Sequence, residues 1–236
     1  MFDFFKWIGS AKSPYRRILA VGDIHGMSER YYSLMRQVQF DADKDFLIFL
    51  GDYIDRGPDS ISILENVKNL AVSPNIVCLR GNHEQMFLDY FDETSKDKSW
   101  KEDGSFYTIH EFSSLKKNNP EKFNELYHFV TSMPLVHEMT IKGKSYAFVH
   151  AGISPYKTLS EQTEYDVLWT REPFYSKYRG TLYFVVGHTP TIFFADISFK
   201  PLILPNHIIL MDTGSYLSEG KLSCMDLLSG KIYQSD

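Results

Sequence analysis

The chain has 236 residues, of which 43% are hydrophobic and 23% are charged, and its formal net charge is −5. This acidic balance argues against a broad nucleic-acid-binding surface, which normally carries a basic excess. No apolar stretch reaches the ~20 residues that a membrane-spanning helix needs, and the length suits a single domain, residues 1–236, with a sizeable core.

The first residues and the two cysteines indicate a cytoplasmic protein. The opening stretch MFDFFKWIGS is apolar, but it is short, is interrupted by charges and does not resemble a signal peptide. We expect residues 1–16 to form an N-terminal extension that packs on the domain, with contact to a membrane or a partner as the alternative. Cys78 and Cys224 lie in apolar runs without CxxC spacing, which predicts two reduced thiols in the core.

Six short apolar runs, rich in β-branched or aromatic residues, recur along the chain, and each ends in polar residues. Continuous apolar runs of this kind are typical of strands that are buried on both faces. The runs are ILAV (18–21), FLIFL (46–50), IVCL (76–79), YAFV (146–149), LYFVV (182–186) and IILM (208–211).

Helical patterns separate the first three runs. Residues 28–38 carry apolar side chains on one face, with Ser28 as the expected N-cap. Residues 58–70 repeat an apolar residue every three positions, and Pro58 suits a first helical turn. A third helical pattern follows the third run. Residues 17–91 therefore predict a βαβαβα unit, in which the strands are parallel and the crossovers right-handed.

The pattern changes in residues 92–133, where a charged stretch precedes a helical segment whose apolar side includes Phe123. We interpret this region as a helical insertion whose aromatic residues form a small core of their own rather than a binding surface. From Ser145 onward we expect mostly strands and loops, with Gly220 and the pair Ser229–Gly230 as turns of closing hairpins.

Polar side chains of similar chemistry follow five of the apolar runs. Because ligands bind outside the carboxyl ends of the strands in open α/β sheets, we expect these side chains to converge. Carboxylate, imidazole and amide groups without a thiolate suit Mn²⁺, Fe or Zn²⁺, and their number suits two ions that share a bridging carboxylate. The residues are Asp23 and His25 in GDIHG, Asp52, Asp55 and Arg56 in GDYIDRG, Asn82 and His83 in GNHE, His150 in HAG, and His188 in GHTP.

Each of these residues taken alone has an ordinary interpretation. An Asp after a strand is often a helix N-cap, and a lone His is usually a surface or satisfied core residue. Four other histidines are interpreted in this way: His110, His128, His137 and His207. The joint pattern favours a site, because Asp23, Asp52 and Asn82 follow one another at intervals of one βα unit. Neighbouring glycines such as Gly81 would permit sharp turns or close backbone approach there.

These five motifs, in this order and spacing, resemble the phosphoprotein phosphatase branch of the calcineurin-like metallophosphoesterases, from about Val21 to Asp212. Within the branch, GNHEQM, LWTREPF and DTG are most similar to bacterial and phage serine/threonine protein phosphatases. The resemblance implies an α/β (α+β) fold with a central β-sandwich flanked by helices and two metal ions at one edge. Manganese is the expected metal, with iron and zinc as alternatives.

The resemblance also implies a role for each motif residue. The first metal would be held by Asp23, His25 and Asp52. Asp52 would bridge to the second metal, which would be held by Asn82, His150 and His188. Arg56 and Arg171 would bind phosphate oxygens through the planar guanidinium group. For Arg171, which lies in WTREP, a surface role is the alternative.

The implied reaction is direct hydrolysis of phosphoserine or phosphothreonine in a protein or peptide by a metal-bridging hydroxide. Because the leaving group is a poor one, it needs a proton. His83 is the expected general acid, and Asp55 is expected to orient His83 and to keep it protonated.

Two other functions remain open on the sequence. A diadenosine tetraphosphate hydrolase, or another small-molecule phosphatase, would share nearly all the motifs. That branch tends to carry Asp where this chain has Glu84, a residue that could also simply favour the start of a helix. A non-catalytic scaffold that binds a partner is less consistent with the sequence, because every motif position is filled.

Overall fold

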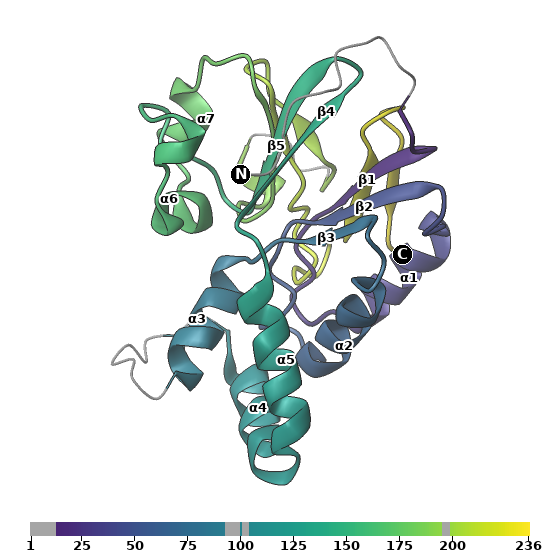
Figure 1. Cartoon of the computed structure of the whole chain (residues 1–236), viewed down its shortest axis with the longest axis vertical. Coiled ribbons are helices and arrows are strands. Elements are labelled where there is room, and N and C mark those ends of the chain that lie inside the picture. The colour runs from purple at the N-terminus through teal and green to yellow at the C-terminus, as the bar shows by residue number, and fades with distance from the viewer. Residues whose placement is uncertain (1–12, 93–99, 101–103, 195–198) are drawn as a thin grey trace, which may run out of the picture.

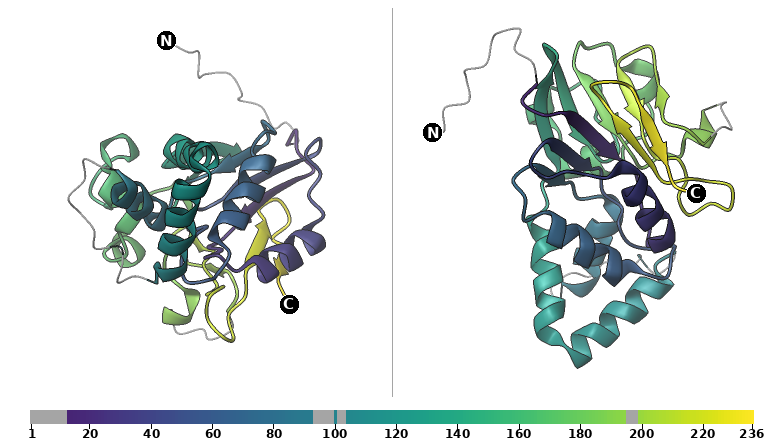
Figure 2. Two further views of the ribbon diagram at one scale, coloured as in Figure 1. Left: turned by 90° about the horizontal axis from the view of Figure 1, so that it is seen from below. Right: turned by 90° about the vertical axis from the view of Figure 1, so that its right-hand side faces the viewer.

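The computed structural model describes residues 13–92, 100, 104–194 and 199–236. The expected packing of the stretch MFDFFKWIGS lies outside these residues, as does most of the charged segment 93–103. Among the described residues, two five-stranded sheets pack face to face, and helices cover their outer faces (Figures 1 and 2). The expected α/β sandwich flanked by helices is therefore confirmed.

The first sheet has the strand order β10-β9-β1-β2-β3, and β1, β2 and β3 are parallel. Helices connect its three parallel strands, which confirms the βαβαβα unit expected for residues 17–91. The elements of this unit are β1 (Arg17–Val21), α1 (Ser28–Val38), β2 (Asp45–Phe49), α2 (Ser60–Leu70), β3 (Ile76–Cys78) and α3 (Asn82–Phe91). The sheet ends in an antiparallel hairpin of β9 (Ser223–Asp226) and β10 (Ile232–Gln234), as the turn at Ser229–Gly230 predicts.

The second sheet has the order β4-β5-β6-β8-β7, in which β5, β6 and β8 are parallel. Its strands are β4 (Val136–Ile141), β5 (Lys144–Val149), β6 (Tyr183–Val186), β7 (Leu202–Ile203) and β8 (Ile208–Leu210). Between β5 and β6 the chain forms the short helices α6 (Glu164–Trp169) and α7 (Phe174–Lys177). Two short 3-10 helices, η2 (Leu159–Glu161) and η3 (Thr191–Phe193), lie in its loops. The apolar runs did not predict β4, because this antiparallel strand is largely half-buried or exposed.

Alternate residues of the buried strands face different cores. In β1, Ile18 and Ala20 pack between the two sheets, whereas Leu19 and Val21 pack under α1 and α2. The strand β5 follows the same rule, with Phe148 between the sheets. This period-two alternation on strands covered on both sides explains why the runs are apolar without interruption.

Residues 92–133 contain two described helices rather than one, α4 (Phe106–Asn118) and α5 (Pro120–Ser132), which extend to one end of the molecule (Figure 1). The expectation that their aromatic residues form a separate small core is wrong. Phe112 and Phe123 are buried against Phe87 of α3, in the same cluster as the outer residues of β1 and β2. The two helices therefore extend the main core.

Two helix starts differ from the sequence-based expectation. Met27 holds the cap position of α1, and the Ser28 hydroxyl donates to Asp59 instead of capping its own helix. The helix α2 begins at Ser60, so Pro58 precedes it. The reason is tertiary, because Asp59 N donates to Gly26 O at 3.2 Å and this bond ties the segment before α2 to the loop before α1.

Both cysteines are buried and unpaired, which confirms the expected core thiols. No helix within the described ranges is long and apolar enough to cross a membrane.

Candidate metal centre and active site

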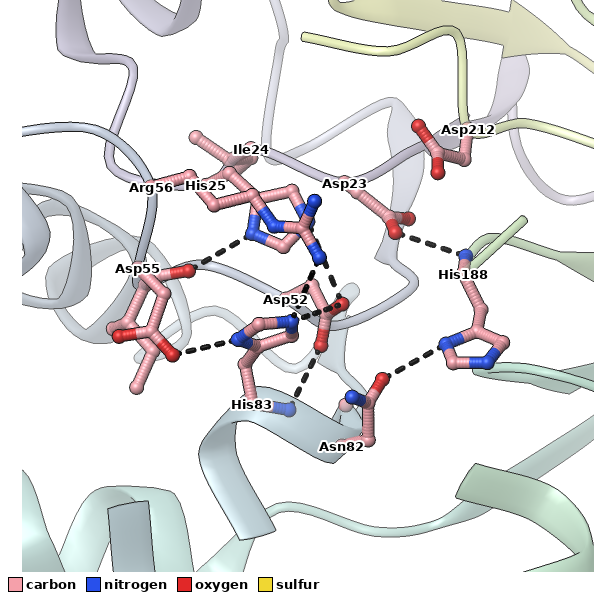
Figure 3. A network of polar contacts seen from close by, with 12 residues as sticks. Asp23, Ile24, His25, Asp52, Asp55, Arg56, Asn82, His83, His188 and Asp212 are labelled. Atoms are coloured by element: carbon pink, nitrogen blue, oxygen red, sulfur yellow. Dashed lines mark hydrogen bonds and ion pairs between the residues drawn. The ribbon is translucent and has the colours of Figure 1, made fainter. Parts of the chain in front are cut away.

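Polar side chains from the segments that follow five strands point into one space, as Figure 3 shows for most of them. The backbone turns sharply at several of these positions: φ is 53° at His25, 54° at Asp52 and 65° at His188. His188 N donates to Asp23 Oδ2 at 2.9 Å, although 165 positions separate the two residues. The fold thus brings together side chains from motifs at opposite ends of the sequence.

Asp52 belongs to two groups of potential metal ligands. Ligand atoms of Asp52, His25 and His83 lie within 4.8 Å of one another, and so do those of Asp52, His150 and His188. Asp52 Oδ1 lies 3.3 Å from His150 Nε2, whereas Asp52 Oδ2 lies 3.6 Å from His25 Nε2. One carboxylate oxygen therefore faces each group, which is the arrangement that a bridging carboxylate between two cations needs.

Asn82 completes the group around His150 and His188. Its Oδ1 lies 2.8 Å from His150 Nε2 and 2.9 Å from His188 Nδ1. Three atoms that can each offer a lone pair therefore converge. The amide oxygen adds a ligand without adding negative charge next to Asp52.

The donor set and an unpaired carboxylate oxygen of Asp23 fit divalent cations. Among the described residues, the buried atom Asp23 Oδ1 has no hydrogen-bond partner, and such orphaned groups are rare because each costs about 1–3 kcal/mol. His25 Nδ1 lies 3.0 Å from Ile54 O, which directs the opposite nitrogen into the site. Metal-binding histidines are usually oriented in this way. Nitrogen and oxygen donors without sulfur suit Mn²⁺, Fe or Zn²⁺.

The carboxylates of the site differ in their electrostatic surroundings. Burial alone would raise the pKa of Asp52, but the positive charges of His150 and His83 hold that pKa well below its usual range. Burial, reinforced by the carboxylate of Asp212, raises the pKa of Asp23 well above its usual range. Asp212 lies beside Asp23 in Figure 3, and burial raises the pKa of Asp212 to about 6. A cation would relieve this crowding of carboxylates.

The histidines of the site also differ. Burial alone would lower the pKa of His150, but Asp52 raises it to about 10. Burial and the charge of His83 lower the pKa of His25, while burial and the charge of His150 lower that of His188. The last two imidazoles are therefore held neutral, which is the form that binds metals.

His83 and Asp55 form a separate pair at the edge of the potential ligands. His83 Nδ1 donates to Asp55 Oδ2 at 2.6 Å, and both side chains are almost fully buried. His83 Nε2 points the other way, 3.4 Å from Arg56 Nη2 and 3.9 Å from Asp52 Oδ2. Burial alone would lower the pKa of His83, but the carboxylates of Asp52 and Asp55 raise it. The pair therefore turns Nε2 of His83 toward the site and favours the protonated form of the His83 imidazole.

The two arginines expected at the phosphate are placed differently. Arg56 lies beside His83, and its guanidinium stacks on the ring of Tyr216, 4.1 Å from the ring centroid. Arg171 is exposed, but it is close enough for its charge to contribute to lowering the pKa of His188. Arg56 therefore borders the His83 side of the site, and Arg171 acts on the His188 side.

Sequence reasoning did not reveal the full role of Glu84. Its side chain is fully buried, and its two carboxylate oxygens accept hydrogen bonds from four backbone amides, those of Gly81, Asp52, Tyr53 and Ile54, at 2.8–3.3 Å. Burial, reinforced by Asp52, raises the pKa of Glu84 to about 7. Its position in the first turn of α3 indicates a role at the helix start. That position does not indicate that Glu84 also binds the backbone of the loop that contains Asp52. A residue so enclosed is a weak basis for choosing between substrates.

Two further contacts have no signal in the sequence. Trp100 Nε1 donates to Asp55 Oδ2 at 2.5 Å, and Tyr216 meets His25 edge to face with ring centroids 5.2 Å apart. Neither residue belongs to a motif at a strand end, so no periodic pattern marks it.

Two glycines of the motifs are required by close approach. A Cβ at Gly187 would lie 2.0 Å from Asp23 Oδ1, and one at Gly81 would lie 2.2 Å from Asp52 Oδ1. Real Cβ atoms do not come so close to another atom, so a larger residue would displace a potential ligand.

Comparison with known proteins agrees with this geometry. Residues 16–214 match the family model for calcineurin-like phosphoesterases. Serine/threonine-protein phosphatase 2 of Salmonella typhimurium is 31% identical over 211 residues, covering 89% of this chain and 92% of that protein. The symmetrical bis(5'-nucleosyl)-tetraphosphatase of Proteus mirabilis is 33% identical over 135 residues, covering 57% of this chain and 44% of that protein.

Solved structures agree on the fold. A structure described as a candidate diadenosine tetraphosphatase has a TM-score of 0.67 at 22% identity, covering 92% of each chain. A serine/threonine phosphatase from Saccharomyces cerevisiae has a TM-score of 0.62 at 17% identity, covering 95% of this chain and 81% of the other. At these identities the similarity concerns the fold alone.

Proposed function

Because this chain belongs to the calcineurin-like phosphoesterase family, we propose that it is a metal-dependent phosphomonoesterase that acts on phosphoserine and phosphothreonine in proteins. The observation that carries the proposal is the His83–Asp55 pair, with its 2.6 Å hydrogen bond at the edge of the Asp52 ligand groups. A proton donor beside a metal centre is the arrangement that ester hydrolysis with a poor leaving group needs.

Calcineurin-like phosphoesterases use a dinuclear metal site. In this chain Asp23, His25 and Asp52 would hold one ion, and Asp52, Asn82, His150 and His188 would hold the other. Bound there, two divalent cations would supply an activated water and positive charge for the phosphate oxygens. We propose manganese as the metal, with iron and zinc as alternatives because both also accept oxygen and nitrogen ligands.

His83 would donate its Nε2 proton to the departing oxygen of the substrate. Asp55 holds the opposite nitrogen at 2.6 Å, which fixes the ring and stabilises its protonated form. Arg56 would bind phosphate oxygens from the same side, with its guanidinium kept in place by Tyr216. Arg171, although exposed, would bind phosphate from the His188 side.

The extent of the sequence matches supports a protein substrate. The similarity to the Salmonella protein phosphatase runs over 92% of that protein, whereas the similarity to the dinucleotide hydrolase runs over 44% of it. The free, buried Cys78 and Cys224 suit a reducing compartment, and we propose a cytoplasmic location with phosphorylated proteins as partners. The second candidate, a dinucleotide tetraphosphate hydrolase, is supported by the fold match with a TM-score of 0.67.

The substrate class is tested by measuring kcat/KM for a phosphothreonine peptide and for diadenosine tetraphosphate on the same Mn²⁺-loaded preparation. We expect the phosphopeptide to be preferred by at least tenfold. A preference for diadenosine tetraphosphate would contradict the proposed protein substrate and favour the second candidate function.

The role of His83 is tested by His83→Asn with an alkyl phosphate and p-nitrophenyl phosphate. The aryl leaving group departs without a proton, so the variant should lose roughly 10²–10⁴-fold on the alkyl ester and much less on the aryl ester. Equal losses on both substrates would contradict the assignment of His83 as the acid.

A further inference from the structure

Trp100 contacts the acid pair directly, although it belongs to none of the motifs. Its indole Nε1 donates to Asp55 Oδ2 at 2.5 Å, and this is the same oxygen that accepts from His83 Nδ1 at 2.6 Å. The other oxygen, Asp55 Oδ1, has no hydrogen-bond partner among the described residues. Two N–H donors on one oxygen therefore determine the orientation of the whole carboxylate.

The indole is itself held rigidly. Trp100 is almost fully buried, and its ring packs edge to face on Phe87, Tyr90 and Phe91 of α3, with centroids 5.5–6.4 Å apart. Ser105 Oγ donates to Trp100 O at 2.6 Å and thereby anchors its backbone. The helix that carries His83 at its start thus also carries the aromatic surface on which Trp100 rests.

We propose that Trp100 is a positioning residue for proton donation to the leaving group. Its N–H holds Asp55 in the one orientation from which the carboxylate can bind His83 Nδ1, so that His83 Nε2 faces the substrate oxygen. Without the indole N–H, the carboxylate can turn about its side-chain bonds, and His83 loses the partner that orients it.

The effect of losing this N–H on kcat should therefore depend on the leaving group of the substrate. Alkyl phosphates such as phosphoserine need the proton from His83, whereas p-nitrophenyl phosphate does not. Trp100→Phe keeps an aromatic ring on Phe87 and Phe91 but removes the N–H. It should therefore reduce kcat for the alkyl substrate by roughly tenfold or more, the value of one hydrogen bond to a charged group. We expect kcat for the aryl substrate to stay within about twofold, and KM to remain unchanged for both.

A matched control separates positioning from packing. Phe91→Leu disturbs the surface under the indole, since the two rings lie 6.4 Å apart, but leaves the N–H in place. Any loss that it causes should be equal for the alkyl and the aryl substrate. The ratio of the two rates does not depend on how much of a variant is folded, so partial unfolding of Trp100→Phe would not imitate the predicted effect.

A double-mutant cycle with His83→Asn gives the sharper test, using the Mn²⁺-loaded full chain and the alkyl phosphate. If Trp100 acts through His83, Trp100→Phe should have no further effect once His83 is replaced. Equal losses of Trp100→Phe on both substrates, or losses that multiply in the double variant, would overturn the inference. The inference rests on the proposed function: a wild-type protein that hydrolyses neither phosphate would overturn both, whereas failure in the cycle alone would leave the proposed function standing.

Discussion

Replacing Glu84 by Gln tests how the loop of Asp52 is held in place. Each carboxylate oxygen of Glu84 accepts two backbone amides, Oε2 from Gly81 and Asp52 and Oε1 from Tyr53 and Ile54. Gln has nearly the same shape, but one oxygen becomes an NH₂ group that can only donate. Two backbone N–H groups would then face another donor in a buried site.

The size of the effect follows from these contacts. At a pH well above the Glu84 pKa of about 7 the carboxylate is charged. A hydrogen bond to a charged group contributes about 1.5–3 kcal/mol, so under these conditions the loss of two should cost about 3 kcal/mol or more. In a chain of this size 1 kcal/mol shifts the melting temperature by about 2–4 °C. We therefore expect Glu84→Gln to melt at least about 6 °C below the wild type, with weaker metal binding because Asp52 lies in the released loop.

Thermal unfolding followed by circular dichroism measures this shift, and amide hydrogen exchange at Asp52, Tyr53 and Ile54 reports the loop directly. The control is Glu125→Gln, which removes a surface carboxylate paired with Lys68 and should leave the melting temperature nearly unchanged. If Glu84→Gln melted like the wild type and its loop amides stayed protected, the proposed role of the carboxylate would be refuted.

Three further predictions concern the metal centre. Asp52→Asn should reduce bound metal, measured by mass spectrometry, and kcat together; a fully loaded, active variant would contradict a bridging role for Asp52. Gly187→Ala should reduce metal binding by at least tenfold, because its Cβ would lie 2.0 Å from Asp23 Oδ1. Unchanged binding in a metal titration would contradict the requirement for glycine at this position. In chelator-treated protein the melting temperature should fall as pH rises from about 7 to 10. The reason is that the pKa of His150 is raised to about 10, so its stabilisation is complete below the unfolded pKa of about 6.5 and is lost as the imidazole deprotonates. His150→Gln should abolish that fall, and a flat profile in the wild type would argue against the ion pair with Asp52.

The short-range pattern of the sequence was sufficient to predict the parallel βαβαβα unit and the group of polar residues at the strand ends. Both depend on local physics. A strand covered on two faces must be apolar along its length, and parallel strands bring the loops at their carboxyl ends to the same edge of the sheet. The same logic failed for β4, which is only partly buried, and for the starts of α1 and α2, where a contact between two loops decides the boundary.

What only the tertiary structure decided is how the polar groups support one another. The sequence placed His83 next to Asn82 and implied different roles for them, but the opposite directions of their side chains follow from contacts with distant residues. His83 turns to Asp55, and Asn82 turns to His188, 106 positions away. The hydrogen bonds by which Glu84 orders the Asp52 loop and Trp100 orients Asp55 could not be predicted, because buried hydrogen bonds between remote residues leave no periodic trace in a sequence. Residue type and spacing therefore determined which groups meet, whereas the packing of loops and helices determined which atom of each group faces which partner.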